Sequence, residues 1–358
     1  MPSCPRAEIV RLGEVAVYHC WNRCVRRAYL CGKDPVTGID YEHRRDWIRA
    51  MQENLAGLFA IEIGFRSELS NHLHLILRTR PDVVETWSDQ EVVRRWLVAS
   101  KLAKSPDGCI REPHPARVAM EMAIPGRIQK LRIRLSDPSW FMAILCEYIS
   151  RRGNREDGCR GAFFEDRYKC RELIDEASIL VCGIYVDLNP IRAGEAQTPE
   201  TSTHTSAYDR IQSRQERLSA AGQEGTETDA SSQTADGWLC ELTLDEQAAV
   251  DGPGMLQSAT QRRASDKGLI PVSLEDYLQL LDASGRIIQA GKSGAIPQHL
   301  APILERLGIR NEMWTDLVTG FDQLFGRVVG ASEKVAQRAA QAGRHWYRGI
   351  ANCAAAFG

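Results

Sequence analysis

The segment SNHLHLIL at residues 70–77 holds two histidines separated by one leucine, inside an apolar run that is typical of a buried strand. Successive side chains of a strand point to opposite faces, so we expect His72 and His74 on one face and Leu73, Leu75 and Leu77 behind them. Two imidazoles held side by side on a rigid strand can bind one divalent cation. The pair therefore predicts a metal site, and the alternative is a polar sheet face without a metal.

The composition is that of an ordinary globular protein. The chain has 358 residues, of which 43% are hydrophobic and 26% charged, enough to bury substantial cores in two domains. It contains no run of roughly 18 apolar residues, and its start, MPSCPR, lacks the apolar core of a signal peptide. Its 11 cysteines include no Cys-x-x-Cys pair, which favours reduced thiols. We expect a soluble, cytoplasmic protein without membrane contacts.

Arginines gather in the amino-terminal half of the chain, where basic residues slightly outnumber acidic ones. The guanidinium group can bind a phosphate through two parallel hydrogen bonds. Each cluster alone is equally typical of a solvated face, but four clusters beside a histidine pair favour a nucleic-acid-binding surface. The clusters are Arg23, Arg26 and Arg27; Arg44, Arg45 and Arg49; Arg127, Lys130, Arg132 and Arg134; and Arg151, Arg152 and Arg155.

The order of elements around the histidine segment predicts an α+β fold. A strand at residues 16–24 is followed by an amphipathic helix at 42–60, a second strand at 61–65 and the histidine strand. This order begins a split βαβ arrangement around an antiparallel sheet. Further helices are predicted at 88–99, where Ser88 and Glu91 form a capping box, at 127–135, and at 140–152, which Ser139 can cap.

The helix predicted at residues 140–152 carries a candidate nucleophile, Tyr148. Ile144 and Arg152 lie one turn away on the same side of the helix, so the phenol could be presented beside a metal held by the sheet. A tyrosine with a pKa near 10 is a poor nucleophile unless cations neutralise the phosphate that it attacks. The alternative, favoured by the apolar periodicity, is that Tyr148 is a core aromatic residue.

Four blocks of sequence together resemble one protein family. They are YHCWNRC at residues 18–24, NHLH at 71–74, GAFFEDRYK at 161–169 and YVDLNPIRAG at 185–194. In this order they are similar to the first strand, the His-hydrophobe-His signature and the two later segments of the single-tyrosine HUH transposases. The insertion-sequence and REP-associated branch, which processes single-stranded DNA, is the most similar. The resemblance spans about residues 10–196.

The resemblance implies a ferredoxin-like catalytic domain at residues 1–196, with Mg²⁺ or Mn²⁺ bound by His72 and His74. It implies a transposase, monomeric or homodimeric, that cleaves and rejoins one strand of single-stranded or hairpin DNA, with Tyr148 joined to the 5′ phosphate. The family places an amide or carboxylate one turn after the tyrosine, where this chain has Arg152; Asn154, or more weakly Glu147, would be the third ligand. The implied DNA contacts are Arg23, Arg26, Arg27, Arg151, Arg152, Arg155, Arg167 and Lys169. The missing amide favours the alternative, a catalytically silent DNA-binding or regulatory protein of the same fold.

The rest of the chain predicts a linker and an accessory region. A buried helix is expected at residues 172–187, with Asp187 and Asn189 fixing the turn that follows it. Residues 197–237 are rich in Thr, Ser, Gln, Glu and Gly, which predicts a disordered linker. Helical patterns beyond it predict a helical accessory domain at residues 238–358, for DNA binding or for assembly.

Overall fold

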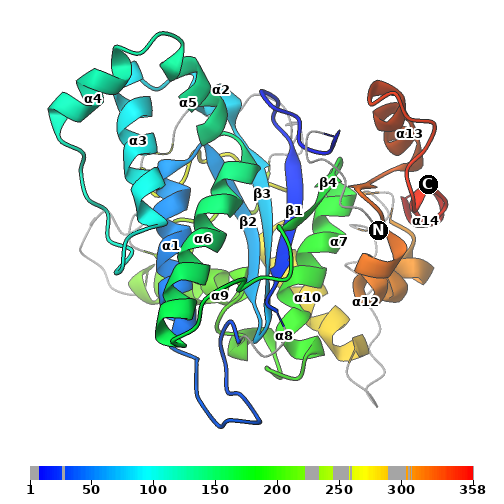
Figure 1. The fold of residues 1–358 in the computed structure, drawn as a ribbon. Helices are drawn as coiled ribbons and strands as arrows, with labels where there is room; N and C mark the ends of the chain where they lie inside the picture. Colours follow the sequence, from blue (N-terminus) through cyan, green and yellow to red (C-terminus); the bar gives the residue numbers. More distant parts are fainter. Residues whose placement is uncertain are drawn as a thin grey trace.

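The computed structural model describes residues 8–25, 29–221, 234–244, 258, 260–288, 304, 307 and 309–357. The chain forms an α+β fold around a five-stranded sheet, so the predicted class is confirmed (Figure 1). The strands are β1 (Val17–Arg23), β2 (Ile61–Glu68), β3 (His72–Thr79), β4 (Lys169–Leu173) and β5 (Val328–Val329), in the spatial order β2-β3-β1-β4-β5.

The sheet is mixed rather than purely antiparallel. β1 pairs antiparallel with both β3 and β4, and β2 pairs antiparallel with β3. β5 comes from the C-terminal region and runs parallel to β4, with Glu172 opposite Val328. The prediction of an antiparallel sheet is therefore wrong at this edge. Sequence periodicity did not reveal β5 because a two-residue strand is too short to show alternation.

Helices α1 (Arg44–Leu58) and α6 (Pro138–Glu156) cover the first face of the sheet, and α3 (Asp89–Leu102) packs against both of them (Figure 1). The alternate leucines of β3 pack against them in one apolar cluster. Local signals set where two of these helices begin. The Ser88 hydroxyl accepts a hydrogen bond from the Glu91 N–H at the start of α3, which is half of the predicted capping box; the Glu91 carboxylate pairs with Arg94 and Arg95 instead. At α6 the cap is Asp137, which precedes Pro138 at the first helical position, and not Ser139.

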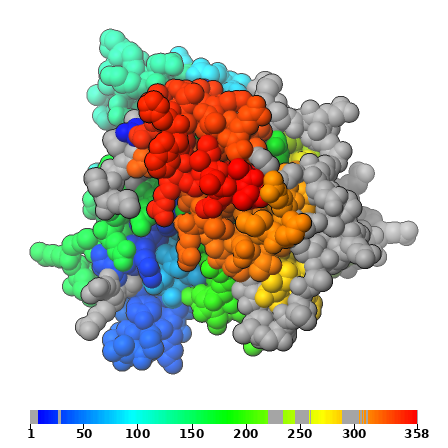
Figure 2. Space-filling view, turned by 90° about the vertical axis from the view of Figure 1, so that its right-hand side faces the viewer, coloured from blue at the N-terminus to red at the C-terminus, as the bar shows by residue number. Residues whose placement is uncertain are grey.

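The second face is covered by α7 (Glu176–Asp187), α10 (Leu274–Ile288) and α12 (Trp314–Leu324). Almost every residue of α7 is buried because the helix lies between the sheet and the C-terminal helices, which also explains its apolar sequence. Figure 2 shows the C-terminal segments, in orange and red, covering this side of the molecule. The C-terminal region thus completes the core of the sheet. The division into separate catalytic and accessory domains stays a prediction.

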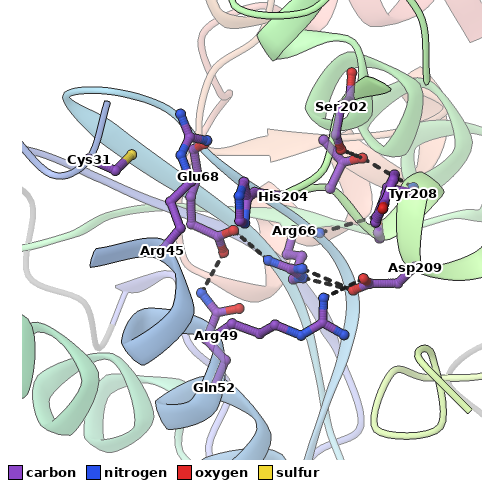
Figure 3. A network of polar contacts seen from close by, with 12 residues as sticks. Cys31, Arg45, Arg49, Gln52, Arg66, Glu68, Ser202, His204, Tyr208 and Asp209 are labelled. Carbon is purple, nitrogen blue, oxygen red and sulfur yellow. Dashed lines mark hydrogen bonds and ion pairs between the residues drawn. The ribbon is translucent and has the colours of Figure 1, made fainter. Parts of the chain in front are cut away.

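Part of the predicted linker is ordered. Helix α9 (Ser206–Ala221) packs against the edge strand β2, and its Asp209 accepts charged hydrogen bonds from Arg66 of β2 and Arg49 of α1 (Figure 3). The prediction of disorder is wrong for this helix, because buried ion pairs hold a polar segment that has few large apolar residues. Residues 222–233 of the predicted linker lie outside the described residues.

The remaining elements are short. They are α2 (Pro81–Val84), α4 (Pro115–Met122), α5 (Arg127–Leu135), α8 (Asn189–Arg192), α13 (Ser332–Gln341), α14 (Ile350–Phe357) and the 3₁₀ turns η2 (Pro199–Thr201) and η4 (Asn311–Met313). In the described part of the chain, no helix combines the length and apolar character needed to cross a bilayer.

Candidate functional site

The two histidines of β3 lie on the second face of the sheet. Their ring centroids are 5.0 Å apart and the rings are nearly perpendicular, at 75°. Leu73, Leu75 and Leu77 belong to the apolar cluster on the first face. The predicted one-face placement of His72 and His74 is therefore confirmed, and both residues line a cleft.

A third histidine, His19 of β1, supports this pair. Its Nε2 lies 2.8 Å from Nδ1 of His74, and its ring stacks between Trp21 and His74. Burial lowers the pKa of both His19 and His74 well below the usual value, so both rings are neutral at physiological pH. The sequence analysis did not include His19 in the site. The signal available in the sequence was its position two residues before Trp21, which places both side chains on one face of their strand. In the structure this strand pairs with β3.

The cleft beside the histidines has a volume of about 250 Å³ and is rich in charge. Arg23, Arg167 and Lys169 are exposed on its wall, so three of the predicted DNA contacts do lie together at the histidine pair. Because β1 pairs with both β3 and β4, the sheet brings these cations to one place. The lining residues are Trp21, Asn22, Arg23, His72, His74, Glu165, Asp166, Arg167, Lys169, Tyr185 and Asp322.

The tyrosine in this cleft is Tyr185 of α7. Its ring centroid lies 5.7 Å from that of His74, and the Arg192 guanidinium lies 5.2 Å from its ring. Its hydroxyl donates a hydrogen bond of 2.6 Å to Oδ2 of Asp322 on α12. Burial, together with the Asp322 carboxylate, raises the pKa of Tyr185. Sequence reasoning placed Tyr185 among core residues, although it begins the block that most resembles the transposase family.

Tyr148 lies on the other side of the sheet. It projects from α6 into the first-face cluster, is 2% exposed, and packs edge-on against Trp47. Its hydroxyl accepts a hydrogen bond from Arg152, which stacks over Trp47. The prediction that Tyr148 is presented beside the histidines is wrong. The alternation that places His72 and His74 on one face turns Leu73, Leu75 and Leu77 toward α6, so the sheet separates Tyr148 from the pair.

The other residues proposed on α6 do not join the site either. The Asn154 side chain donates a hydrogen bond to the carbonyl of Gly161, and Glu147 forms an ion pair with Arg151. Arg155 is exposed on the last turn of the same helix. Asn154 and Glu147 were candidate metal ligands, and their place on α6 separates them from the histidines. Arg26 and Arg27 lie outside the described residues. Among the residues that the structure describes, no three His, Cys, Asp or Glu side chains are grouped so that they could hold a metal.

Comparisons with known proteins add little to this geometry. No family model and no curated protein matches the chain. One solved structure that matches is described as "Structure of the REP associates tyrosine transposase bound to a REP hairpin". It is 12% identical, with a TM-score of 0.30, and the match covers 64% of this chain and 94% of that one. At this level the likeness carries no argument, and the function must be argued from the residues themselves.

Proposed function

We propose that this chain is a metal-assisted DNA strand transferase of the transposase type, in which Tyr185 is the nucleophile in place of Tyr148. The observation that carries the proposal is that Tyr185 lies 5.7 Å from His74, ring centroid to ring centroid, in a cleft whose lining includes three cations, Arg23, Arg167 and Lys169, beside three carboxylates. A phenol, a histidine pair and phosphate-binding side chains are the groups that a phosphotyrosine mechanism needs.

The topology supports an HUH-type, ferredoxin-like core. α1 lies between β1 and β2, α6 precedes β4 on the same face, and the first four strands have the order β2-β3-β1-β4. In this arrangement the histidine strand is central, with β1 beside it. The site is thus built on the strands that are hydrogen-bonded on both edges, which hold side chains more rigidly than loops do.

The cations of the cleft would hold the DNA backbone. Arg23, Arg167 and Lys169 are exposed on its wall, and the exposed Arg192 stacks beside Tyr185. Phosphates of a single strand or of a hairpin are the ligand that this charge favours. In the reaction, the Tyr185 oxygen forms a bond to phosphorus while the bond from phosphorus to the 3′ oxygen breaks. The phenolic proton is lost, the 3′ oxygen gains a proton, and the bond is restored by the reverse step.

The side chains fit a divalent cation at the histidine pair. Nδ1 of His72 lies 2.6 Å from the Asn71 amide oxygen, so Nδ1 carries the proton and Nε2 keeps its lone pair. Nε2 of His74 is buried without a hydrogen-bond partner in the described structure. A bound Mg²⁺ or Mn²⁺ would supply Lewis-acid stabilisation of charge on the phosphate oxygens. Since imidazole nitrogens are softer than the oxygen ligands that Mg²⁺ prefers, Mn²⁺ should be held more tightly.

Asn189 is the best candidate for a third ligand. It follows Tyr185 by one helical turn, because the helical hydrogen bonding continues from α7 through Leu188 into α8. This is where the family places an amide. Its Nδ2 atom is buried and has no hydrogen-bond partner among the described residues. A half-turn of the amide exchanges nitrogen for oxygen and would place a metal-binding atom there.

A second candidate function, a catalytically silent DNA-binding protein, is favoured by the state of Tyr185. Only 5% of this residue is exposed, and its hydroxyl is held by Asp322. Such a protein would bind the same DNA through the same cations without forming a covalent bond.

The two functions are separated by a covalent adduct that survives denaturation. The wild-type protein, incubated with Mn²⁺ and a DNA hairpin carrying a single-stranded flank, should give a protein-DNA band on a denaturing gel. Tyr185→Phe should abolish the band because phenylalanine keeps the ring and removes the oxygen. Tyr148→Phe is the matched control and should keep it. DNA binding by the wild type without any adduct would establish the silent function instead.

A further inference from the structure

We propose that Asp322 of α12 is a positioning residue for Tyr185, so that the C-terminal region forms part of the catalytic site. This inference rests on the proposed function, because it assigns a role in the same reaction. The two residues are 137 positions apart in the chain, and Asp322 lines the cleft together with the histidine pair.

Both oxygens of the Asp322 carboxylate have a specific partner. Oδ2 accepts the hydrogen bond of 2.6 Å from the Tyr185 hydroxyl, and Oδ1 accepts one of 2.9 Å from the Arg171 guanidinium. Arg171 therefore fixes the orientation of the carboxylate, and the carboxylate in turn holds the Tyr185 hydroxyl. A hydrogen bond to an ionised acceptor is shorter and stronger than a neutral one, which suits a group that must hold a hydroxyl.

Arg171 is itself held on three sides. It projects from β4, and its guanidinium lies 4.7 Å from the Trp21 ring and 5.1 Å from the Phe321 ring. It also donates a hydrogen bond to the carbonyl of Phe321, the residue before Asp322. The chain of contacts therefore runs from the sheet through Arg171 to α12, and from α12 to the nucleophile.

Tyr185 needs this support because its hydroxyl could otherwise point to either side in the plane of the ring. The ring is already located by His74 and by Phe321, whose centroid lies 5.5 Å away. The remaining freedom is the direction of the O–H bond, and the Asp322 carboxylate sets it. Fixing a reacting group before the reaction lowers the entropy that must be lost at the barrier, and small misplacements slow the step strongly.

Two substitutions separate positioning from charge. Asp322→Asn keeps one oxygen that can accept from the phenol, although its amide nitrogen then faces Arg171, and Asp322→Leu removes both acceptors. Asp316→Leu on the same helix is the control, because Asp316 is exposed outside the cleft. We expect Asp322→Leu to slow adduct formation by about tenfold or more at saturating DNA, with a smaller loss in Asp322→Asn. The Kd for DNA should not rise in any of the three variants, because each removes a carboxylate and none removes a cation.

A second measurement does not depend on activity. With 3-fluorotyrosine at position 185, the ¹⁹F resonance of the free protein should shift in Asp322→Leu and stay in place in Asp316→Leu. Equal losses of rate in Asp322→Leu and Asp322→Asn, or no loss in either, would overturn positioning while leaving the proposed function intact. If wild type forms no adduct, the proposed function fails. In that case the ¹⁹F shift still decides whether Asp322 holds Tyr185, and an unshifted resonance overturns the contact as well.

Discussion

Nε2 of His19 and Nδ1 of His74 lie 2.8 Å apart between the paired strands β1 and β3. Both pKa values are lowered by burial, so one neutral ring donates to the other. If Nδ1 of His74 is the donor, its Nε2 keeps the lone pair that a metal ion requires. His19 would then orient a ligand without binding the metal itself.

Removing His19 should accordingly weaken metal binding without abolishing it. We expect His19→Leu to lower the affinity for Mn²⁺ by about tenfold to a hundredfold, the range for a residue that orients a metal-binding histidine. The double variant His72→Ala, His74→Ala should lose Mn²⁺ binding and keep the fold. Titration calorimetry measures both effects, and an unchanged affinity in the double variant would exclude the histidine site.

The cations of the cleft predict how DNA affinity depends on salt. Each phosphate contact to single-stranded DNA contributes about 0.7 to the slope of log affinity against log salt concentration. Arg192→Ala and Lys169→Ala should each reduce the slope by about this amount. Arg286 is the control, because it is exposed on α10 and paired with Asp282 away from the cleft. A flat salt response in the wild type, measured by fluorescence anisotropy, would contradict a DNA-binding cleft.

Local periodicity predicted much of this site, and long-range packing decided the rest. The alternation of a strand was enough to place His72 and His74 on one face. It was not enough to say which face α6 covers, and the choice of Tyr148 depended on that. Tyr185 was hidden because α7 is buried on all sides, which makes its sequence apolar around the whole helix. Asp322 was unreachable from sequence, since its partner lies 137 residues away.

Tyr148 should therefore matter for stability and not for chemistry. Tyr148→Phe removes the hydroxyl that accepts a hydrogen bond from Arg152 and keeps the packing against Trp47. Losing one such bond costs about 1 kcal/mol, so the free energy of unfolding should fall by roughly this amount in urea titrations. Adduct formation should stay at the wild-type level. A variant of unchanged stability that loses the adduct would return Tyr148 to the catalytic site.

His204 lies beside the edge strand β2 and makes the stability of the fold depend on pH. Burial, the largest cause, and the nearby Arg45, Arg66 and Arg49 together lower its pKa to about 3 (Figure 3). In the unfolded chain the same ring titrates near 6.5. Above this pH both states are neutral and His204 contributes no pH dependence. Between about 6.5 and 3 only the unfolded state binds the proton, so the free energy of unfolding falls as the pH falls.

Replacing His204 should reduce the decrease in the free energy of unfolding at low pH. His204→Gln has no group that titrates in this window, so its free energy of unfolding should decrease less between pH 7 and pH 4 than that of the wild type. The control is His345→Gln, since His345 is exposed between α13 and α14. Urea titrations at a series of pH values give both slopes. Parallel curves for wild type and His204→Gln would show that burial and the arginines do not keep His204 neutral, because its pKa would then match that of the unfolded chain.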